Sequence, residues 1–172
     1  LHFVEVQEPD MHDPSGDLRR LKQALEREWE LTNLSSDLSL LPSLQKTLRK
    51  GDWKVTVAVD NESQIIAVWP GFKERIYGLA VDVGSTTIAA NLCDLATGQV
   101  VSSAGIMNPQ IRFGEDLMSR VSYVMMHPGG EVEMTKAVRS ALNDLIAEVA
   151  SNANILVEDV VSFTFVANPV MH

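Results

Sequence analysis

The segment Tyr77–Thr87, with the sequence YGLAVDVGSTT, constrains this chain more than any other stretch. A run of apolar residues ends at Asp82, small and hydroxyl-bearing residues follow over Gly84–Thr87, and a second apolar run begins at Ile88. This order predicts two buried strands joined by a tight turn. Glycine allows close approach of a ligand, and successive N–H groups in such a turn can converge on a phosphate oxygen. An ordinary β-hairpin turn has the same pattern, so both interpretations stay open.

The turn supplies the first candidate site residues, which are Asp82, Gly84, Ser85, Thr86 and Thr87. In the phosphate interpretation, Asp82 at the strand end faces a polyphosphate and its Mg²⁺. The turn residues hold the phosphates through backbone N–H and hydroxyl groups. In the alternative, Asp82 caps its own turn and Thr87 is a strand residue chosen for its β propensity.

Composition narrows the class of protein. The 172 residues carry a net charge of −9, which argues against a nucleic-acid groove or attraction to an anionic membrane. No apolar run is long enough to span a bilayer, and the first residues lack the pattern of a signal peptide. Cys93 is the single cysteine, so the sequence itself cannot form a disulfide or a four-cysteine metal site. We therefore expect a cytoplasmic protein.

The periodicity predicts an α/β fold in two domains, residues 1–75 and 76–172. The first domain reads β-α-α-β-β. Its helices begin near Asp17 and after an N-cap at 35–37, and Gly51 ends the second helix. Its strands are expected at residues 3–6, 53–59 and 65–69. The second domain reads β-β-β-α-α-β, with strands at 76–83, 87–93, 99–106 and 160–166 and helices at about 117–125 and 131–152.

A polar segment, residues 108–116, separates the third strand of the second domain from its first helix. It is too varied for a simple linker. We expect a cleft where a second lobe or a partner docks, lined by Asn108, Gln110, Arg112, Glu115 and Asp116, and among these Asn108, Gln110 and Asp116 are the candidates to bind the cofactor. Asp116 also has an alternative role as the N-cap of the helix that begins at Leu117. Arg112 and Arg120 are candidates to face phosphates, although surface ion pairs are the commoner role of arginine.

The strand and helix order, with Asp-Val-Gly-Ser-Thr-Thr at residues 82–87, resembles the first lobe of the superfamily of sugar kinases, heat-shock chaperones and actin-type ATPases. A narrower resemblance covers nearly the whole chain. Residues 78–87, Asn108-Pro109-Gln110, Phe113-Gly114-Glu115-Asp116 and Ser119-Arg120 are similar to the reductive activators of corrinoid proteins. The ending, residues 166–172, is also similar, although Ala167 stands where that family is expected to have glycine.

The resemblance implies a partial RNase H-like, actin-type ATPase lobe after a small α/β domain. It implies that ATP and Mg²⁺ bind in the complete protein, with Asp82 positioning Mg²⁺ directly or through water. It further implies a [2Fe–2S] cluster on a domain not present in this sequence and a corrinoid protein as partner. Separately from the resemblance, we expect a homodimer. In such a family, ATP binding and hydrolysis drive one-electron reduction of Co(II) to Co(I).

The resemblance leads us to expect that this chain is a fragment that lacks the ferredoxin domain and the second ATPase lobe. By itself it is then expected to bind ATP very weakly, with negligible turnover. Two other functions stay open. The chain could be a non-catalytic assembly module, whose small domain mediates dimerisation through its three tryptophans. It could also be part of a small-molecule kinase of the same superfamily.

Overall fold

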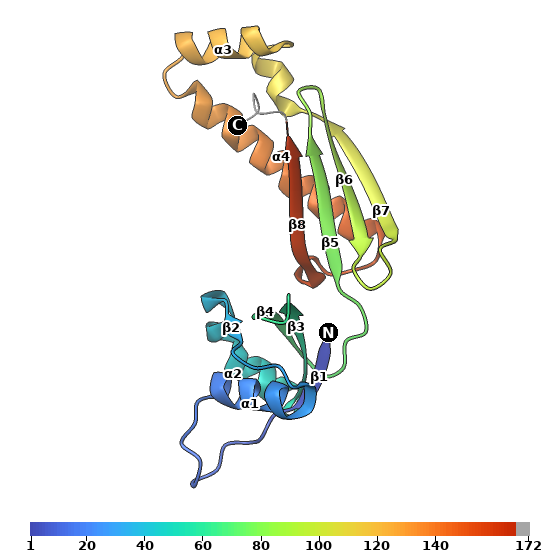
Figure 1. Ribbon diagram of the computed structural model, residues 1–172. Helices are drawn as coiled ribbons and strands as arrows, with labels where there is room; N and C mark the ends of the chain where they lie inside the picture. The colour runs from blue at the N-terminus through green and yellow to red at the C-terminus, as the bar shows by residue number, and fades with distance from the viewer. Residues whose placement is uncertain (168–172) are drawn as a thin grey trace. The chain divides into compact units, whose positions relative to one another are not determined.

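The computed structural model describes residues 1–167, and the chain divides into two compact units. The first unit is Leu1–Glu74 and the second begins at Arg75 (Figure 1). Both units are mixed α/β, which confirms the predicted fold class, and their strands and helices follow the predicted order. No helix among the described residues is long and apolar enough to cross a membrane.

The first unit packs two helices against a four-stranded sheet of order β1-β3-β4-β2. Its apolar side chains at helical and strand spacing meet in one core, in which Leu21, Leu25 and Leu48 lie against Val55 and Val57. The elements are β1 (His2–Glu5), α1 (Asp17–Trp29), β2 (Ser35–Ser36), η1 (Leu38–Leu40), α2 (Leu41–Lys50), β3 (Lys54–Asp60) and β4 (Gln64–Pro70).

The predicted N-cap of the second helix is wrong in detail. Ser35 and Ser36 form the short strand β2, which pairs in parallel with β4. Asp37 does cap a helix, but it is η1, where its Oδ1 accepts a hydrogen bond of 2.8 Å from the N–H of Ser39. The helix α2 then begins at Leu41, with a proline in its first turn, and ends at Gly51 as predicted.

The three tryptophans of the first unit have different surroundings. Trp53 is buried in the core, whereas Trp29 is 46% exposed and donates its Nε1–H to the Phe3 carbonyl at 3.0 Å. Trp69 is half-buried beneath the ammonium group of Lys73. Of the three tryptophans, only Trp53 is therefore a core residue.

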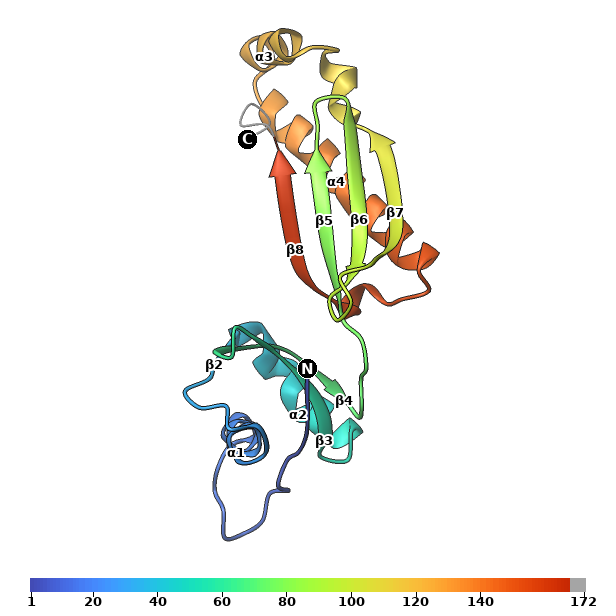
Figure 2. The same cartoon turned by 45° about the vertical axis from the view of Figure 1, so that its right-hand side comes forward.

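The second unit is a four-stranded sheet of order β7-β6-β5-β8, in which β8 runs parallel to β5 and the other neighbours are antiparallel (Figure 2). This order is consistent with the predicted first lobe of an actin-type ATPase. The elements are β5 (Tyr77–Val83), β6 (Thr87–Asp94), β7 (Val100–Met107), η2 (Pro109–Phe113), α3 (Leu117–Met126), α4 (Gly130–Asn152), η3 (Val157–Asp159) and β8 (Val160–Ala167).

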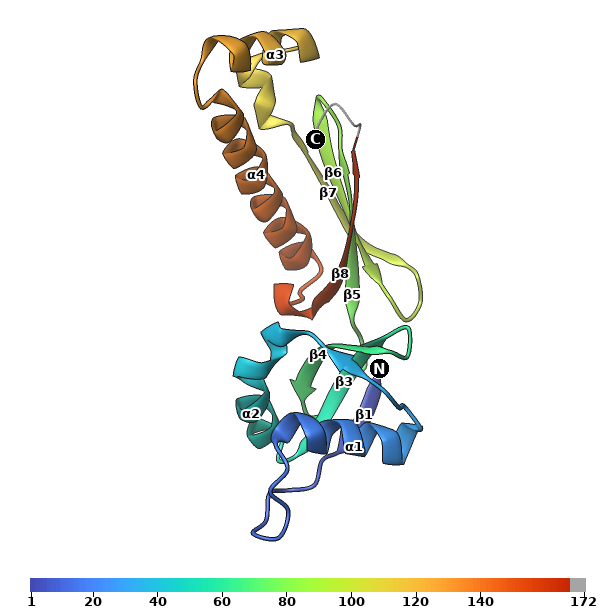
Figure 3. The same cartoon turned by 60° about the vertical axis from the view of Figure 1, so that its left-hand side comes forward.

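The helix α4 lies along one face of this sheet (Figure 3). Leu145 and Val149 of α4 pack against Leu79, Val81 and Ile88 of the strands. Because successive strand residues point to opposite faces, the residues between these core positions lie on the face away from α4. The expectation of two buried strands therefore holds for one face of β5 and β6, and the other face carries exposed residues.

Residues 168–172 lie outside the described part of the chain. The predicted family-like ending, residues 166–172, therefore falls mostly beyond it. Its described residues, Val166 and Ala167, end β8 beside Asp82 and Val83 of β5. The end of β8 and the end of β5 thus lie at the same edge of the sheet.

Candidate functional site

The turn between β5 and β6 is closed tightly. The N–H of Gly84 donates to the carbonyl of Thr87 at 2.9 Å. A Cβ on residue 84 would lie 2.8 Å from that same carbonyl oxygen, which is closer than a methyl group tolerates. Glycine is therefore required by this close approach of two backbone segments. Ser85, Thr86 and Thr87 are exposed.

Three carbonyls of the turn, those of Gly84, Ser85 and Thr86, accept hydrogen bonds from residues that follow β7. The Nδ2 of Asn108 donates to the Gly84 oxygen at 2.8 Å, and the N–H of Asn108 donates to the Thr86 oxygen at 2.7 Å. The Nη2 of Arg120 donates to the Ser85 oxygen at 2.6 Å. Within residues 1–167, by contrast, the N–H groups of Ser85 and Thr86 have no acceptor. The carbonyl groups of the turn are thus hydrogen-bonded within the protein, whereas the N–H groups of Ser85 and Thr86 can still donate to a ligand.

Asp82 lies on the exposed face of the sheet, two residues before Gly84. It pairs with Ala89 of β6 and Val166 of β8, and its side chain is exposed. Its carboxylate makes no hydrogen bond or ion pair with another described residue. Asp82 does not cap its own turn in this structure. A carboxylate that is free and exposed beside available N–H groups can approach a hydrated cation on a bound anion.

Asn108 is almost fully buried, with 1% of its surface exposed. Besides the two bonds to the turn, its Oδ1 accepts from the N–H of Gln110 at 2.9 Å and so caps η2. Because its amide is fully used inside the protein, Asn108 supports the turn from behind. Gln110 follows within η2 and is half-buried, so it stays a candidate for direct contact.

Replacing Asn108 with alanine is expected to destabilise the second unit by about 1–3 kcal/mol, because the carbonyl of Gly84 and the N–H of Gln110 lose a buried partner. Urea denaturation followed by circular dichroism measures this change. The matched control is Asn143→Ala on the exposed side of α4, for which a change within about 0.5 kcal/mol is expected. Equal stabilities of the two variants would show that the Asn108 amide is dispensable.

Asp116 takes the capping role that the sequence offered as its alternative. Its Oδ1 accepts a hydrogen bond of 2.8 Å from the N–H of Ser119 at the start of α3. This hydrogen bond, with smaller help from the charge of Arg120, lowers the pKa of the Asp116 carboxyl. The structure therefore brings Asp82, the turn and Asn108 together, while Asp116 is engaged with α3.

The lowered pKa of Asp116 predicts a pH dependence of α3. A carboxyl whose pKa is depressed on folding stabilises the folded state above its unfolded pKa of about 3.9 and loses this effect as the pH falls through the folded value. Asp116→Ala is therefore expected to weaken α3 at pH 7 and to differ less from the wild type in strong acid. Hydrogen exchange of the α3 amides in both proteins measures this. A difference that persists unchanged into strong acid would contradict it.

Arg120 is the residue near the turn whose surroundings differ most from those that the sequence predicts. It is buried, with 3% of its surface exposed, and its Nε donates to the Gly114 carbonyl at 2.9 Å. It is therefore neither a surface ion pair nor an exposed ligand. One signal was available: Arg120 follows the cap residue Asp116 by four residues, which returns its side chain to the inner side of α3.

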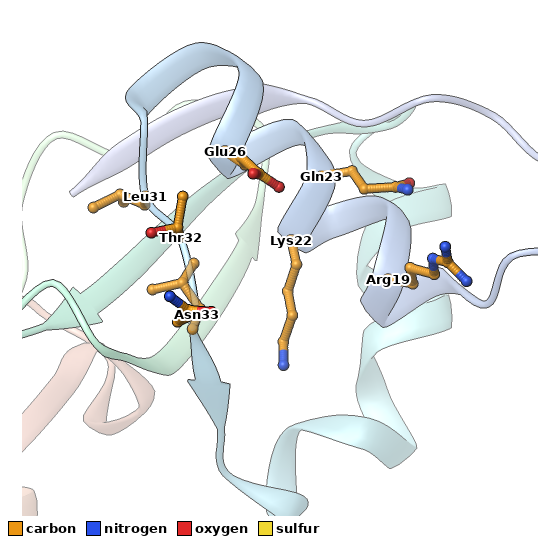
Figure 4. A pocket seen from close by; sticks show the side chains of 8 residues that line it. Arg19, Lys22, Gln23, Glu26, Leu31, Thr32 and Asn33 are labelled. Carbon is orange, nitrogen blue, oxygen red and sulfur yellow. The ribbon is translucent and has the colours of Figure 1, made fainter.

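Other parts of the described chain are weaker candidates for a functional site. No group of three or more His, Cys, Asp and Glu residues there is placed to hold a metal ion. Cys93 is half-buried in β6. In the first unit, a shallow pocket lies between α1 and residues 31–34 (Figure 4). Its charged side chains, Arg19, Lys22 and Glu26, come from one helix, and of these the half-buried Lys22 points into the pocket.

The comparisons with known proteins agree on one family. Residues 1–75 match the model of the RACo linker region, and residues 77–172 match that of the RACo middle region. The "Corrinoid activation enzyme RamQ" of Eubacterium limosum is 31% identical over 100 residues, which are 58% of this chain and 17% of that protein.

A solved structure, the "Reductive activator for corrinoid,iron-sulfur protein", is similar over 99% of this chain with 30% identity and a TM-score of 0.75. The chain spans 28% of that protein. It thus covers a minor part of each relative. Both family models and both relatives lead to the same conclusion: this chain belongs to the RACo family of corrinoid reductive activators.

Proposed function

We propose that this chain forms part of an ATP-dependent activator that reduces Co(II) to Co(I) in corrinoid proteins, and that the turn Gly84–Thr87 binds the phosphates of ATP. One observation supports this most. The N–H groups of Ser85 and Thr86 have no acceptor among the described residues, and the nearby Asp82 has an exposed carboxylate without a hydrogen bond or ion pair there. Backbone N–H groups suit phosphate oxygens, and a carboxylate suits the water shell of Mg²⁺.

The residues present fit an ATP·Mg²⁺ group. The exposed hydroxyl groups of Ser85, Thr86 and Thr87 stand beside the available N–H groups, and Asp82 would hold Mg²⁺ through water. When bound, ATP supplies a ligand whose hydrolysis changes the affinity of the site. A ligand shifts a conformational balance only through its differential affinity for the two states. Asp82 and the turn would sense the terminal phosphate and so favour one conformation of the activator.

The electron source lies elsewhere in this proposal. One electron passes from a reduced [2Fe–2S] cluster to Co(II), which gives the oxidised cluster and Co(I). Such a cluster takes four cysteine ligands, and Cys93 is the only cysteine here. The cluster is therefore proposed to belong to another part of the complete protein. The complete protein is further proposed to be cytoplasmic and to have a corrinoid protein as its partner.

The experiment uses the complete reading frame that encodes this chain, mixed with a corrinoid protein in the Co(II) state and a chemical reductant of the cluster. The absorbance of Co(I) is followed with ATP, without ATP, and with a non-hydrolysable analogue. Formation of Co(I) that depends on hydrolysable ATP is expected. Equal rates with and without ATP would overturn the proposed coupling.

We also propose that the first unit mediates homodimer formation. Phe72 is 74% exposed and contacts Phe3 edge-on at the surface, and Trp29 is 46% exposed. Exposed aromatic residues are typical of interfaces. Light scattering of the 172-residue chain should give twice the mass of one chain, and a clean monomer at high concentration would contradict this proposal.

A further inference from the structure

Arg120 connects α3 to the turn between β5 and β6. Its Nε and Nη2 donate to two carbonyls, those of Gly114 and Ser85, at 2.9 and 2.6 Å. Gly114 permits this approach, since a Cβ there would lie 2.7 Å from the backbone nitrogen of Arg120. The turn, η2 and α3 thus meet at one end of the sheet (Figure 2).

The two side-chain bonds to the turn fix the direction of two N–H groups. In a trans peptide the C=O and the N–H point to opposite sides, and the described chain has no cis peptide bond. Asn108 holds the Gly84 carbonyl, so the N–H of Ser85 points away from Asn108. Arg120 holds the Ser85 carbonyl, so the N–H of Thr86 points away from Arg120.

We propose that Arg120 is a positioning residue that presents the N–H of Thr86 to a bound phosphate. This inference rests on the proposed function of the turn. Arg120 acts through the Ser85–Thr86 peptide and makes no contact with the phosphate in this scheme.

The surroundings of Arg120 suit this role better than a purely structural one. Its guanidinium is buried, its Nη1 has no hydrogen-bond partner among residues 1–167, and it forms no ion pair within 4.0 Å there. An incompletely satisfied buried cation is costly to a fold. The charge of Arg120 contributes only a little to the lowered pKa of the Asp116 carboxyl. The remaining positive charge stands behind the turn, where it favours an anion.

The test is a titration of the complete protein, ¹⁵N-labelled at serine and threonine, with magnesium tripolyphosphate, followed through the amide signals of Ser85 and Thr86. Arg120→Gln keeps a donor that reaches the Gly114 carbonyl but not the Ser85 carbonyl. We expect Arg120→Gln to raise the Kd for tripolyphosphate about tenfold, which is the usual effect of losing a charge-assisted hydrogen bond. Arg120→Lys reaches the Ser85 carbonyl with one donor, and it is expected to restore much of the affinity.

Arg139→Gln is the matched control, because it removes the same charge from the exposed side of α4. It is expected to change the Kd less than twofold. The titration reads only folded protein, so a loss of stability alone does not move the Kd. If Arg120→Gln gives no dispersed spectrum, Arg120→Lys decides: shifted Ser85 and Thr86 signals with a Kd only slightly above the wild-type value support the proposal, and unshifted signals with the wild-type Kd contradict it.

The outcomes separate the two proposals. If wild-type signals do not respond to tripolyphosphate, the phosphate site is wrong, and the role of Arg120 falls with it. If the wild type binds and both Arg120 variants bind equally well, the phosphate site stands and the positioning role is wrong. Tenfold weaker binding by Arg120→Gln alone, with rescue by lysine, supports both.

Discussion

Replacing Asp82 with asparagine is expected to lower the rate of ATP-dependent Co(I) formation by the complete protein about a hundredfold. The substitution keeps the size of the side chain and removes the charge that would hold hydrated Mg²⁺ at the phosphates. Removal of one preorganised electrostatic contact at a reacting group costs about this much. Because the Asp82 carboxylate makes no hydrogen bond or ion pair with another described residue, we expect the substitution to have little effect on folding.

The readout for Asp82→Asn is the initial rate of Co(I) absorbance at saturating ATP. Its stability to urea should stay within about 0.5 kcal/mol of the wild type, as for other surface substitutions. Asp144→Asn on the exposed side of α4 is the charge-matched control, and it should leave the rate unchanged. An Asp82→Asn variant that keeps more than half of the wild-type rate would remove Asp82 from the site.

Leu145→Ala is expected to destabilise the second unit by about 2–5 kcal/mol, the usual cost of a leucine-to-alanine cavity in a core. Leu145 is 1% exposed and joins α4 to the sheet. Leu48→Ala is the counterpart in the first unit, where Leu48 is fully buried in a separate core. Each substitution is expected to act on its own unit because the two cores share no residue.

Hydrogen exchange of amides in the two units measures both substitutions in one experiment. In Leu145→Ala, protection should fall for β5 and β6 and persist for β3 and β4, and Leu48→Ala should give the reverse. The exposed residue Leu156, 64% exposed, supplies a control in Leu156→Ala, with a small effect. Equal loss of protection in both units from either core substitution would contradict independent cores.

The element order could be predicted from the sequence because periodicity and turn residues act locally. The helix α2 ends at Gly51, and the alternating residues Val55, Val57 and Val59 of β3 face the core of the first unit. The strand β2 could not be predicted in this way. It consists of Ser35 and Ser36, which are polar and too few to show a period, and they become a strand only through β4.

The candidate site likewise has a part that the local sequence predicts and a part that depends on residues far apart in the chain. The turn Gly84–Thr87 lies within one local pattern, so its residues could be recognised directly. The hydrogen bonds that orient the turn join residues far apart in the sequence. Asn108 and Gly84 are 24 positions apart, and Arg120 and Ser85 are 35 positions apart. No local period carries such information. The exposure of Asp82 likewise depends on which face α4 covers.

The most direct test is a structure of the complete protein with Mg²⁺ and a non-hydrolysable ATP analogue. The account predicts phosphate oxygens within hydrogen-bond distance of the N–H groups of Ser85 and Thr86, with Asp82 linked to Mg²⁺ through water. A nucleotide bound at another place, with these N–H groups facing solvent and Asp82 remote from the metal, would contradict it.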